Sequence, residues 1–456
     1  MSGVDYHPGD RIAALATPAS RSALALIRLS GDGTIDTLAP LFSPSETLRK
    51  ADSHSAHHGV MQNPRTGEIV DEVVLVVYRA PTSFTGEESA EIMPHGSIPG
   101  VRMLLELLFE NGFREANPGE FTLRSFINGK IDLPQAEAVR ELIEAKTRTA
   151  HLVAVNRLSG GTNELYGNLR RRLLDLIAPV ELALDYPEEE TGTPIDIHPF
   201  DTIAADALLR RIDEFLDRFR VGRIYRDGYR IVIAGATNAG KSSLFNLLLR
   251  EERAIVSEVH GTTRDFIDSW ISIREIPVRL FDTAGLREID DEIESAGVRK
   301  TESLLADADC ILYLVDASRG ETAEDRDRIE SLRPDRCLRL WSKCDLSETA
   351  PPDGYLTSSS IRGDGFRALE DAIFEKAGGF RDSQDATYLE SDRQKRCLER
   401  FRAAVSRAVV VAAEGFALDA IAAELSDAVA VLGELTGEIT SSEILESVFS
   451  KFCVGK

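Results

Sequence analysis

Cysteine is scarce in this sequence, and long apolar runs are missing. The 456 residues include five cysteines, none in a Cys-x-x-Cys pair, so neither a zinc site nor a disulfide framework is indicated. No stretch approaches the roughly 18 uninterrupted apolar residues that a membrane helix requires. The opening residues, Met-Ser-Gly-Val-Asp-Tyr, lack the charged-then-apolar pattern of a secretion signal. We therefore expect a cytoplasmic protein with no membrane partner.

Positive charge is also in short supply. The formal net charge is −23, which argues against a protein that coats nucleic acid with its whole surface. Basic residues cluster only locally, and for them we favour solvated helix faces and a domain junction over an RNA-binding stripe. These residues are Arg170, Arg171, Arg172, Arg210, Arg211, Arg218, Arg220, Arg223 and Arg226.

Residues 235–242 read Gly-Ala-Thr-Asn-Ala-Gly-Lys-Ser, a complete phosphate-binding loop. The loop follows an apolar strand pattern at 229–233 and opens a helical pattern at 244–249, which is the context that the motif requires. Its glycines let backbone N–H groups surround phosphate oxygens, and the helix N-terminus adds partial positive charge. Lys241 is expected to reach the β- and γ-phosphates, and Ser242 to ligate Mg²⁺.

Matching segments follow in the order of a nucleotide-binding domain. Thr263, at the end of Gly261-Thr262-Thr263, is placed to be the second Mg²⁺ ligand. Residues 278–281 alternate as an edge strand would and end at Asp282-Thr283-Ala284-Gly285. There Asp282 suits an outer-sphere Mg²⁺ ligand, and the Gly285 amide suits a γ-phosphate contact. Alternating strands and helices predict a parallel α/β sheet with the ligand at the carboxyl ends of its strands.

The segment expected to bind the base departs from the usual guanine motif, Asn-Lys-x-Asp. It reads Ser342-Lys343-Cys344-Asp345, with serine in the place of asparagine. Asp345 can accept hydrogen bonds from N1–H and the exocyclic amine of guanine, which adenine does not offer, so GTP is favoured over ATP. We interpret Ser342 as a tolerated surface change rather than a specificity switch. The predicted GTP-binding residues are Asn238, Ala239, Gly240, Lys241, Ser242, Ser243, Ser257, Glu258, Val259, His260, Gly261, Thr262, Thr263, Asp282, Thr283, Ala284, Gly285, Ser342, Lys343, Asp345, Ser359, Ser360 and Ile361.

Hydrolysis of the nucleotide needs an unusual arrangement. Small signalling GTPases carry a water-orienting glutamine where this chain has Leu286, and the acidic run 288–294 offers carboxylates instead. The chain also has no obvious arginine finger to place positive charge near the transferred phosphate. A monovalent cation could fill that position, and a site of this size suits K⁺ better than Na⁺. Its predicted ligands are the Asn238 side chain and backbone carbonyls near Ser257, Val259 and Thr262.

The remaining sequence predicts two further kinds of domain. The N-terminal third alternates short apolar runs with turns and holds one helical stretch at 101–110, which predicts a small α+β domain. Residues 128–220 and those from 392 onward have helical spacing, so the nucleotide domain reads as an insertion in a discontinuous helical domain. Pro179 is expected to kink or divide its helix, and Ser441 or Ser442 to cap the last one. The predicted domains are 1–120, 121–221, 222–378 and 379–456.

Beyond the nucleotide motifs, the sequence resembles the MnmE (TrmE) family of tRNA-modification GTPases from end to end. The distinctive segments are Ala16-Thr17-Pro18, Ile27-Arg28-Leu29-Ser30-Gly31, Ser83-Phe84-Thr85-Gly86-Glu87, Asn117-Pro118-Gly119-Glu120-Phe121-Thr122, Asn128-Gly129-Lys130-Ile131-Asp132-Leu133, Gln135-Ala136-Glu137-Ala138 and Phe452-Cys453-Val454-Gly455-Lys456. The departures are Ser342, the Ala-Ser-Arg-Ser segment 19–22 where a glycine-rich stretch is usual, and Ser97 where glycine is usual.

The resemblance implies an N-terminal α+β domain that dimerises and binds 5-formyltetrahydrofolate, a discontinuous helical domain, and an inserted Ras-like P-loop GTPase domain. It implies folate contacts at Arg28, Glu91, Lys130 and Lys456, because a pterin offers donors to a carboxylate and its glutamyl tail offers carboxylates to basic side chains. Arg28 alone reads as a surface charge, whereas the four positions together favour a site. The resemblance also assigns the hydrolytic carboxylate to Glu294, which joins Asn238 and Lys241 as the predicted catalytic residues.

Partners and chemistry are implied as well. Family members act with the flavoprotein MnmG (GidA), which brings FAD and NADH, in a heterotetramer. Together they add an aminomethyl or carboxymethylaminomethyl group to C5 of the wobble uridine of certain tRNAs, using a one-carbon unit of tetrahydrofolate. Potassium-stimulated dimerisation of the GTPase domains would gate that reaction. This chain has no Gly-x-Gly-x-x-Gly fingerprint, which agrees with a flavin held by the partner.

Three other functions fit parts of the sequence. A ribosome-assembly GTPase would carry an appended RNA-binding domain with concentrated positive charge, which the sequence lacks. A folate-dependent one-carbon transferase would explain the N-terminal third but not the GTPase motifs. A regulatory switch without its own chemistry fits those motifs but would bind no folate.

Overall fold

The computed structural model describes residues 9–185, 200–251, 253–254, 268–282, 302–347, 349–378, 391–415 and 417–455. The chain forms two compact units. Unit 1 comprises Met1–Arg140, Arg157–Thr202 and Ala403–Lys456, and unit 2 comprises Glu141–Asn156 and Ile203–Arg402. Four helices belong partly to each unit: α5 (Leu133–Glu144), α6 (Arg148–Leu158), α9 (Thr202–Asp227) and α14 (Asp392–Ala413).

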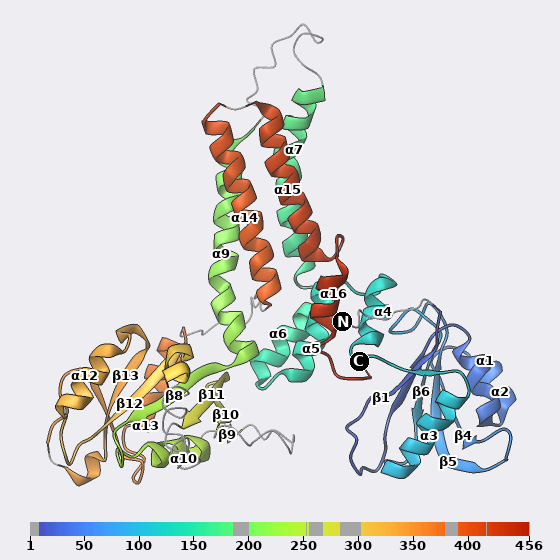
Figure 1. Ribbon diagram of the computed structural model, residues 1–456, viewed down its shortest axis with the longest axis horizontal. Coiled ribbons are helices and arrows are strands. Elements are labelled where there is room, and N and C mark those ends of the chain that lie inside the picture. The colour runs from blue at the N-terminus through green and yellow to red at the C-terminus, as the bar shows by residue number, and fades with distance from the viewer. Residues whose placement is uncertain are drawn as a thin grey trace, which may run out of the picture. The chain divides into compact units, whose positions relative to one another are not determined.

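Unit 1 contains a seven-stranded sheet in the order β3-β4-β5-β6-β2-β1-β7 (Figure 1). Its strands are β1 (Ile12–Leu15), β2 (Ile27–Ser30), β3 (Phe42–Ser43), β4 (Ser55–Gln62), β5 (Ile69–Tyr78), β6 (Ser89–Met93) and β7 (Arg114–Glu115). Neighbouring strands are antiparallel except for β1 and β7. Because side chains alternate across a strand, Ile27 and Leu29 join the core while Arg28 faces the opposite side.

Short helices complete the core of this sheet. They are α1 (Thr34–Leu38), α2 (Ser45–Arg49) and α3 (Ile98–Glu110), with a 3₁₀ turn at Ala39–Leu41. Leu104 and Leu108 of α3 are fully buried against the core residues of β2 and β5. The α+β class predicted for the N-terminal part is therefore confirmed.

The helical part of unit 1 is built around α7. Its helices are α4 (Glu120–Ile127), α7 (Asn163–Asp185), α15 (Leu418–Thr436) and α16 (Ser442–Phe449). Pro179 lies inside α7, and the helix continues on both sides of it, so of the two expected outcomes, a kink or a division, the division is wrong. The reason is packing: Ile177 and Val180 are buried, and α7 packs against α15, which offsets the roughly 3 kcal/mol that an interior proline costs. Of the two serines predicted as possible caps, it is Ser441 that caps α16, and its hydroxyl accepts a hydrogen bond from the Ile444 amide.

Unit 2 contains a second seven-stranded sheet in the order β14-β13-β12-β8-β11-β10-β9. Its strands are β8 (Tyr229–Gly235), β9 (Arg253–Ala254), β10 (Asp268–Ile273), β11 (Ile276–Asp282), β12 (Cys310–Asp316), β13 (Cys337–Ser342) and β14 (Tyr355–Ser358). The pairs from β11 through β8, β12 and β13 to β14 are parallel, which confirms the predicted parallel α/β sheet.

The strand predicted at the sheet edge is an interior one. Residues 278–281 lie in β11, which has β8 on one side and β10 on the other. Arg274 and Glu275, both at positive φ, form the two-residue turn that folds β10 back onto β11. Because β10 pairs with β11, β11 is not at the edge of the sheet. Alternation within residues 278–281 could not reveal this pairing.

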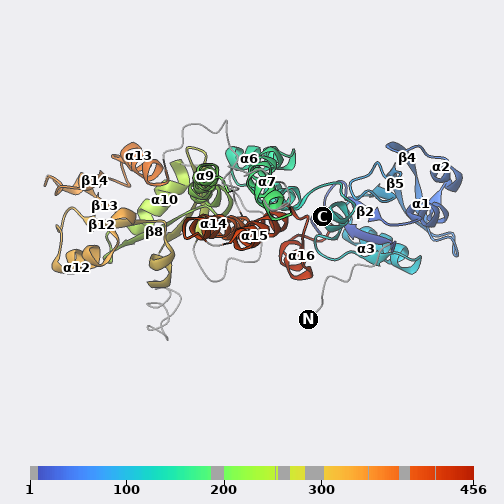
Figure 2. The same ribbon diagram turned by 90° about the horizontal axis from the view of Figure 1, so that it is seen from above.

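Helices cover both faces of the sheet in unit 2 (Figure 2). α10 (Lys241–Glu251) and α13 (Phe366–Lys376) pack on one face, where Leu248 and Ile373 are fully buried. α12 (Ala323–Ser331) packs on the other face of the sheet, where Val232 and Val315 belong to the hydrophobic core. The five parallel strands, β11, β8, β12, β13 and β14, end at the same edge of the sheet, where their loops meet.

Candidate functional site

The phosphate-binding loop joins β8 to α10. Gly235 has φ 139°, and a Cβ there would lie 2.4 Å from the carbonyl oxygen of Leu314 on the neighbouring strand, so only glycine fits. Asn238 and Gly240 have φ values of 65° and 98°, both in the left-handed region. The loop thus turns tightly into the start of an 11-residue helix, whose N-terminal amides and dipole favour an anionic ligand.

Lys241 and Ser242 open this helix. The Lys241 ammonium donates to the carbonyl oxygens of Gly235 at 3.0 Å and Ala236 at 2.8 Å, so it lies across the loop. The Ser242 hydroxyl donates to Asp282 Oδ2 at 3.0 Å, because β8 and β11 are neighbours and end together. A hydroxyl and a carboxylate oxygen at this spacing are ligands of the kind that Mg²⁺ prefers. The residues present therefore fit a magnesium nucleotide.

Ser342 does not lie on the surface, so the interpretation of this serine as a surface change is wrong. Its exposed fraction is 4%, because it ends a strand that has neighbours on both sides. Its Oγ lies 2.7 Å from the carbonyl oxygen of Ala239 in the phosphate-binding loop and 3.0 Å from that of Val315. The base-binding segment is therefore joined to the phosphate-binding loop through this hydroxyl.

The rest of the base-binding segment is also held by hydrogen bonds. Asp345 Oδ1 accepts from the hydroxyl of Ser359, which is fully buried, at 2.7 Å. The Lys343 ammonium donates to Asp316 Oδ2 at 2.7 Å. Partial burial acts to raise the pKa of Asp316, but its hydrogen bonds from Lys343 and Ser318 outweigh burial and lower it. Asp316 therefore stays ionised and fixes the lysine beside the loop.

Further predicted residues lie in the same loops. Ser243 on α10 is exposed, Ser360 is half-buried and Ile361 is 83% exposed. Several predicted residues fall outside the described ranges: Ser257, Glu258, Val259, His260, Gly261, Thr262, Thr263, Thr283, Ala284, Gly285 and Glu294. The structure thus brings together the phosphate-loop, Asp282 and base-binding residues, and their roles stay predictions.

Unit 1 brings together two of the predicted folate residues. Arg28 and Glu91 are paired across β2 and β6, and Arg28 Nη2 lies 2.9 Å from Glu91 Oε1. The Tyr78 hydroxyl donates to Glu91 Oε2 at 3.3 Å, and burial together with the Glu91 carboxylate raises the pKa of Tyr78. Sequence reasoning missed Tyr78, because its nearness to Glu91 depends on the register of β5 against β6, which no local signal specifies.

The C-terminal segment lies against the same residues. Arg28 Nη1 donates to the carbonyl oxygen of Gly455 at 3.2 Å, and the Gly119 amide donates to that of Cys453 at 3.4 Å. Gly455 approaches β1 so closely that a Cβ would lie 2.7 Å from the carbonyl oxygen of Leu15. Lys456 itself lies outside the described residues. Arg28 therefore joins the chain end to the sheet and is more than a solvated surface charge.

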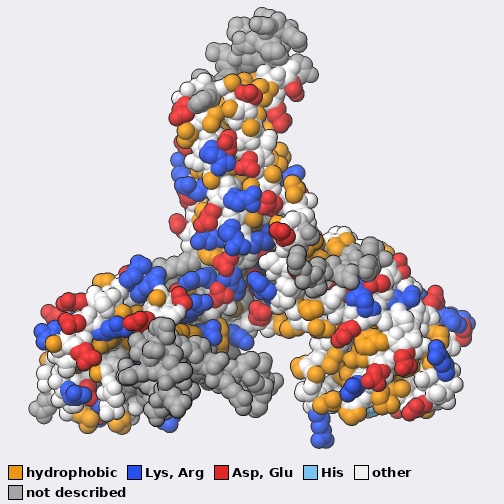
Figure 3. Space-filling model, viewed as in Figure 1, with side chains coloured by type: hydrophobic (Ala, Val, Ile, Leu, Met, Phe, Trp, Pro, Cys, Tyr) orange, Lys and Arg blue, Asp and Glu red, His pale blue; other side chains and the backbone are white. Residues whose placement is uncertain are grey.

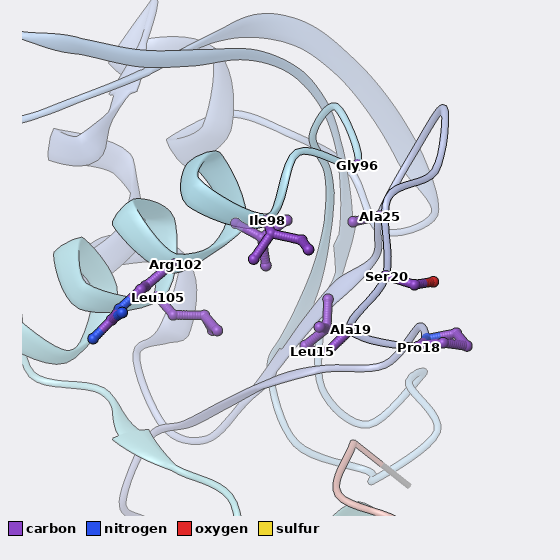
Figure 4. Close-up of a pocket in the computed structure, with 10 residues that line it drawn as sticks. Leu15, Pro18, Ala19, Ser20, Ala25, Gly96, Ile98, Arg102 and Leu105 are labelled. Atoms are coloured by element: carbon purple, nitrogen blue, oxygen red, sulfur yellow. The ribbon is translucent and has the colours of Figure 1, made fainter. Parts of the chain in front are cut away.

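Lys130 follows α4 in the same unit. Its ammonium donates to the carbonyl oxygen of Pro81 at 3.0 Å. Unit 1 also has a pocket of about 190 Å³ between the segment after β1 and the start of α3 (Figure 4). Its lining residues are Leu15, Pro18, Ala19, Ser20, Ala25, Gly96, Ile98, Val101, Arg102 and Leu105. Arg28, Glu91 and Lys130 do not line this mostly apolar pocket, so it is separate from the predicted folate residues.

The described residues contain no group of three or more His, Cys, Asp or Glu side chains arranged to hold a metal ion. Within the same ranges, no helix is long and apolar enough to cross a membrane.

The fold of unit 2 and the loops at its sheet edge define a P-loop nucleotide-binding protein of the Ras-like GTPase class, joined to an α+β domain and long helices. Family models agree with this combination. The model described as "MnmE helical domain" matches residues 133–453, and the one described as "GTP-binding protein TrmE N-terminus" matches residues 11–130. The chain belongs to the MnmE (TrmE) family of tRNA modification GTPases.

Individual relatives match over almost the whole chain. A "tRNA modification GTPase MnmE" of Carboxydothermus hydrogenoformans is 38% identical over 467 residues, which cover 98% of this chain and 99% of that protein. The protein of the same name from Treponema denticola is 38% identical over 473 residues, with 99% of each chain covered. Among solved structures, the G domain of the T. maritima FeoB iron transporter aligns with 32% of this chain and 98% of its own, at 21% identity and a TM-score of 0.25.

Proposed function

We propose that this chain binds and hydrolyses GTP and thereby drives the modification of tRNA at C5 of the wobble uridine. The observation that carries the proposal is the contact between Ser242 and Asp282 at the end of a complete phosphate-binding loop, in a chain that matches the family from residue 11 to residue 453. Within this proposal the domain boundaries 1–120, 121–221, 222–378 and 379–456 are those expected from the sequence.

GTP and Mg²⁺ would be held at the carboxyl edge of the sheet in unit 2. Lys241 would donate to phosphate oxygens in place of the carbonyl oxygens of the loop. Ser242 and Thr263 would ligate Mg²⁺, and Asp282 would be an outer-sphere ligand. When bound, the metal neutralises charge that develops on the β- and γ-phosphates. Asp345, oriented by Ser359, would accept from the Watson–Crick edge of guanine.

Hydrolysis is proposed to depend on Glu294 and on a potassium ion. Glu294 would orient the attacking water, since Leu286 cannot. Asn238 is exposed in the loop, so its amide oxygen is accessible to a cation, with Ser257, Val259 and Thr262 as further ligands. The positive charge of the potassium ion would act where other GTPases use an arginine.

A tetrahydrofolate is proposed to bind beside Arg28, Glu91 and the chain end. Glu91 accepts from Arg28 through one oxygen and from Tyr78 through the other. A carboxylate has about four lone-pair sites, so Glu91 retains capacity for the donors of a pterin. Lys130 and Lys456 would pair with the carboxylates of the glutamyl tail. When bound, the folate supplies the one-carbon unit.

The proposed assembly is a homodimer that combines with the flavoprotein MnmG into a heterotetramer, with FAD and NADH on the partner. Hydrophobic side chains gather over the domain that holds β1–β6 (Figure 3), which suits a self-association surface. Among the described residues of this domain, the exposed large hydrophobic ones are Leu24, Ile69, Val74, Phe84, Ile98 and Met103.

Nucleoside analysis of tRNA from a deletion strain tests the function. Aminomethyl- and carboxymethylaminomethyl-uridine should be missing, and the intact gene should restore them. The variant Ser242→Ala should not restore them, whereas Ser331→Ala, which changes an exposed serine on α12, should. An unchanged nucleoside profile in the deletion strain would refute the proposal and favour a regulatory switch or ribosome assembly.

A further inference from the structure

Ser342 occupies the position of the asparagine in the usual guanine motif, and its contacts suggest how the base is recognised. We infer that Ser342 holds the phosphate-binding loop and leaves N7 of the purine without a hydrogen bond from a side chain of residues 342–345. Recognition of the base then rests on hydrogen bonds from its Watson–Crick edge to Asp345. This inference rests on the proposed GTP site.

The contacts of the Ser342 hydroxyl determine what it can do. Its oxygen lies within hydrogen-bond distance of two carbonyl oxygens, Ala239 O at 2.7 Å and Val315 O at 3.0 Å. A carbonyl oxygen only accepts, so the single hydroxyl proton is engaged by one or shared between both. What remains on Ser342 Oγ is lone pairs, and guanine N7 and O6 are themselves acceptors. Ser342 therefore has no proton to donate to the base.

The other side chains of the segment 342–345 do not replace it. The Lys343 ammonium is held 2.7 Å from Asp316 Oδ2. Cys344 carries a thiol, which is a weak donor, and Asp345 as a carboxylate only accepts. An asparagine would bring an amide with two N–H donors as well as an acceptor oxygen, enough for the loop and a base together. With its single hydroxyl proton, Ser342 makes the contact with the loop but not the contact with the base.

The consequence is an unusual pattern of base specificity. Replacing N7 of guanine by a C–H group removes an acceptor that no side chain of this segment addresses, so affinity should stay within about twofold. Removing the exocyclic amine, as in inosine, deprives the Asp345 carboxylate of a donor. A hydrogen bond to a charged group corresponds to a loss of about 10- to 100-fold in affinity.

The test uses the full-length protein and three diphosphates, which avoid hydrolysis during titration. Displacement of a fluorescent GDP by GDP, 7-deaza-GDP and IDP gives their relative affinities. We expect GDP and 7-deaza-GDP to be equal within about twofold and IDP to be at least about 10-fold weaker. A 7-deaza-GDP that binds 10-fold or more weakly than GDP would overturn the inference, since N7 would then be recognised. Failure of all three to bind would instead refute the proposed GTP site.

A second measurement tests the loop contact without nucleotide. Ser342→Ala should accelerate hydrogen exchange of the amides of residues 236–240 in the nucleotide-free protein. It should also weaken GDP and 7-deaza-GDP equally, by about 3- to 10-fold, and leave the ratio of IDP to GDP affinity unchanged. The matched control is Ser358→Ala, because Ser358 is the β14 register partner of Ser342 and is equally buried at 4%. Equal exchange rates in both variants would mean that the Ser342 hydroxyl does not hold the loop.

Discussion

Ser359 donates a hydrogen bond of 2.7 Å to Asp345 and so joins the loop after β14 to the loop after β13. The Asp345 carboxylate is thereby oriented by a residue that is itself fully buried. A carboxylate fixed in this way is suited to accept two donors from one base edge.

Asp345→Asn should shift nucleotide preference from GTP towards xanthosine triphosphate. The amide can donate to the xanthine carbonyl that replaces the amine of guanine, whereas the carboxylate is repelled by it. Competition binding of GTP and xanthosine triphosphate measures the change. The exposed Asp353→Asn serves as the control. Unchanged preference for GTP in Asp345→Asn would remove Asp345 from the base site.

Glu294→Ala should lower GTP turnover by about 10²-fold while leaving nucleotide affinity nearly intact, because a general-base-type contribution has about this size. Single-turnover hydrolysis and GDP titration measure the two quantities separately. If the variant turns over GTP as fast as the unmodified protein, Glu294 has no role in hydrolysis and is one of the solvated carboxylates of the acidic segment 288–294.

Asn238→Ala should flatten the response of GTP hydrolysis to potassium. In the unmodified protein the rate should rise steeply with KCl and hardly at all with NaCl, because the proposed site suits the larger ion. Rates are compared at matched ionic strength, so that general screening is constant. Equal rates in the two salts would indicate that Asn238 only shapes the loop.

Removal of the chain end should abolish folate binding and tRNA modification but spare GTP hydrolysis. Phe452 is 6% exposed and packs with Phe449 in the core, so its loss would also disturb packing. The deletion is therefore best made after Phe452, removing Cys453 to Lys456. Titration of 5-formyltetrahydrofolate checks it, and retained affinity would place the tail outside the site.

Arg124→Leu should destabilise unit 1 by about 3–5 kcal/mol, the usual cost of removing one partner from a buried ion pair. The Arg124 side chain is fully buried, and its guanidinium lies 2.9 Å from both Glu120 and Glu87. The free energy of unfolding in urea measures the change. Arg102→Leu is the control, since that arginine is exposed and pairs with Glu106 on the surface.

The same cluster adds a dependence of stability on pH. Burial acts to raise the pKa of Glu120, but hydrogen bonds from Arg114, the Asn117 amide and Arg124 outweigh it and lower the pKa below its ordinary 4.5. Because the pKa of Glu120 is lower in the folded than in the unfolded protein, its carboxylate stabilises the fold at pH values above the ordinary 4.5. This stabilisation is lost as pH falls through the lowered pKa of the folded protein. The loss of stability as pH falls below about 4.5 should be smaller in Glu120→Gln, as measured by urea unfolding at each pH.

By itself the sequence determined the phosphate-binding loop, the α+β and α/β classes, a serine cap at 441 or 442 and the family. Each of these is carried by residues close together in the chain, where turn geometry, strand alternation and capping act locally. Only the tertiary structure decided that residues 278–281 form an interior strand, that α7 continues through Pro179, and that Ser342 is buried against Ala239. Likewise, the contacts of Glu91 with Tyr78 and of Arg28 with Gly455 depend on strand register and on the return of the chain end. Such pairings are set by packing between distant segments, which local spacing does not encode.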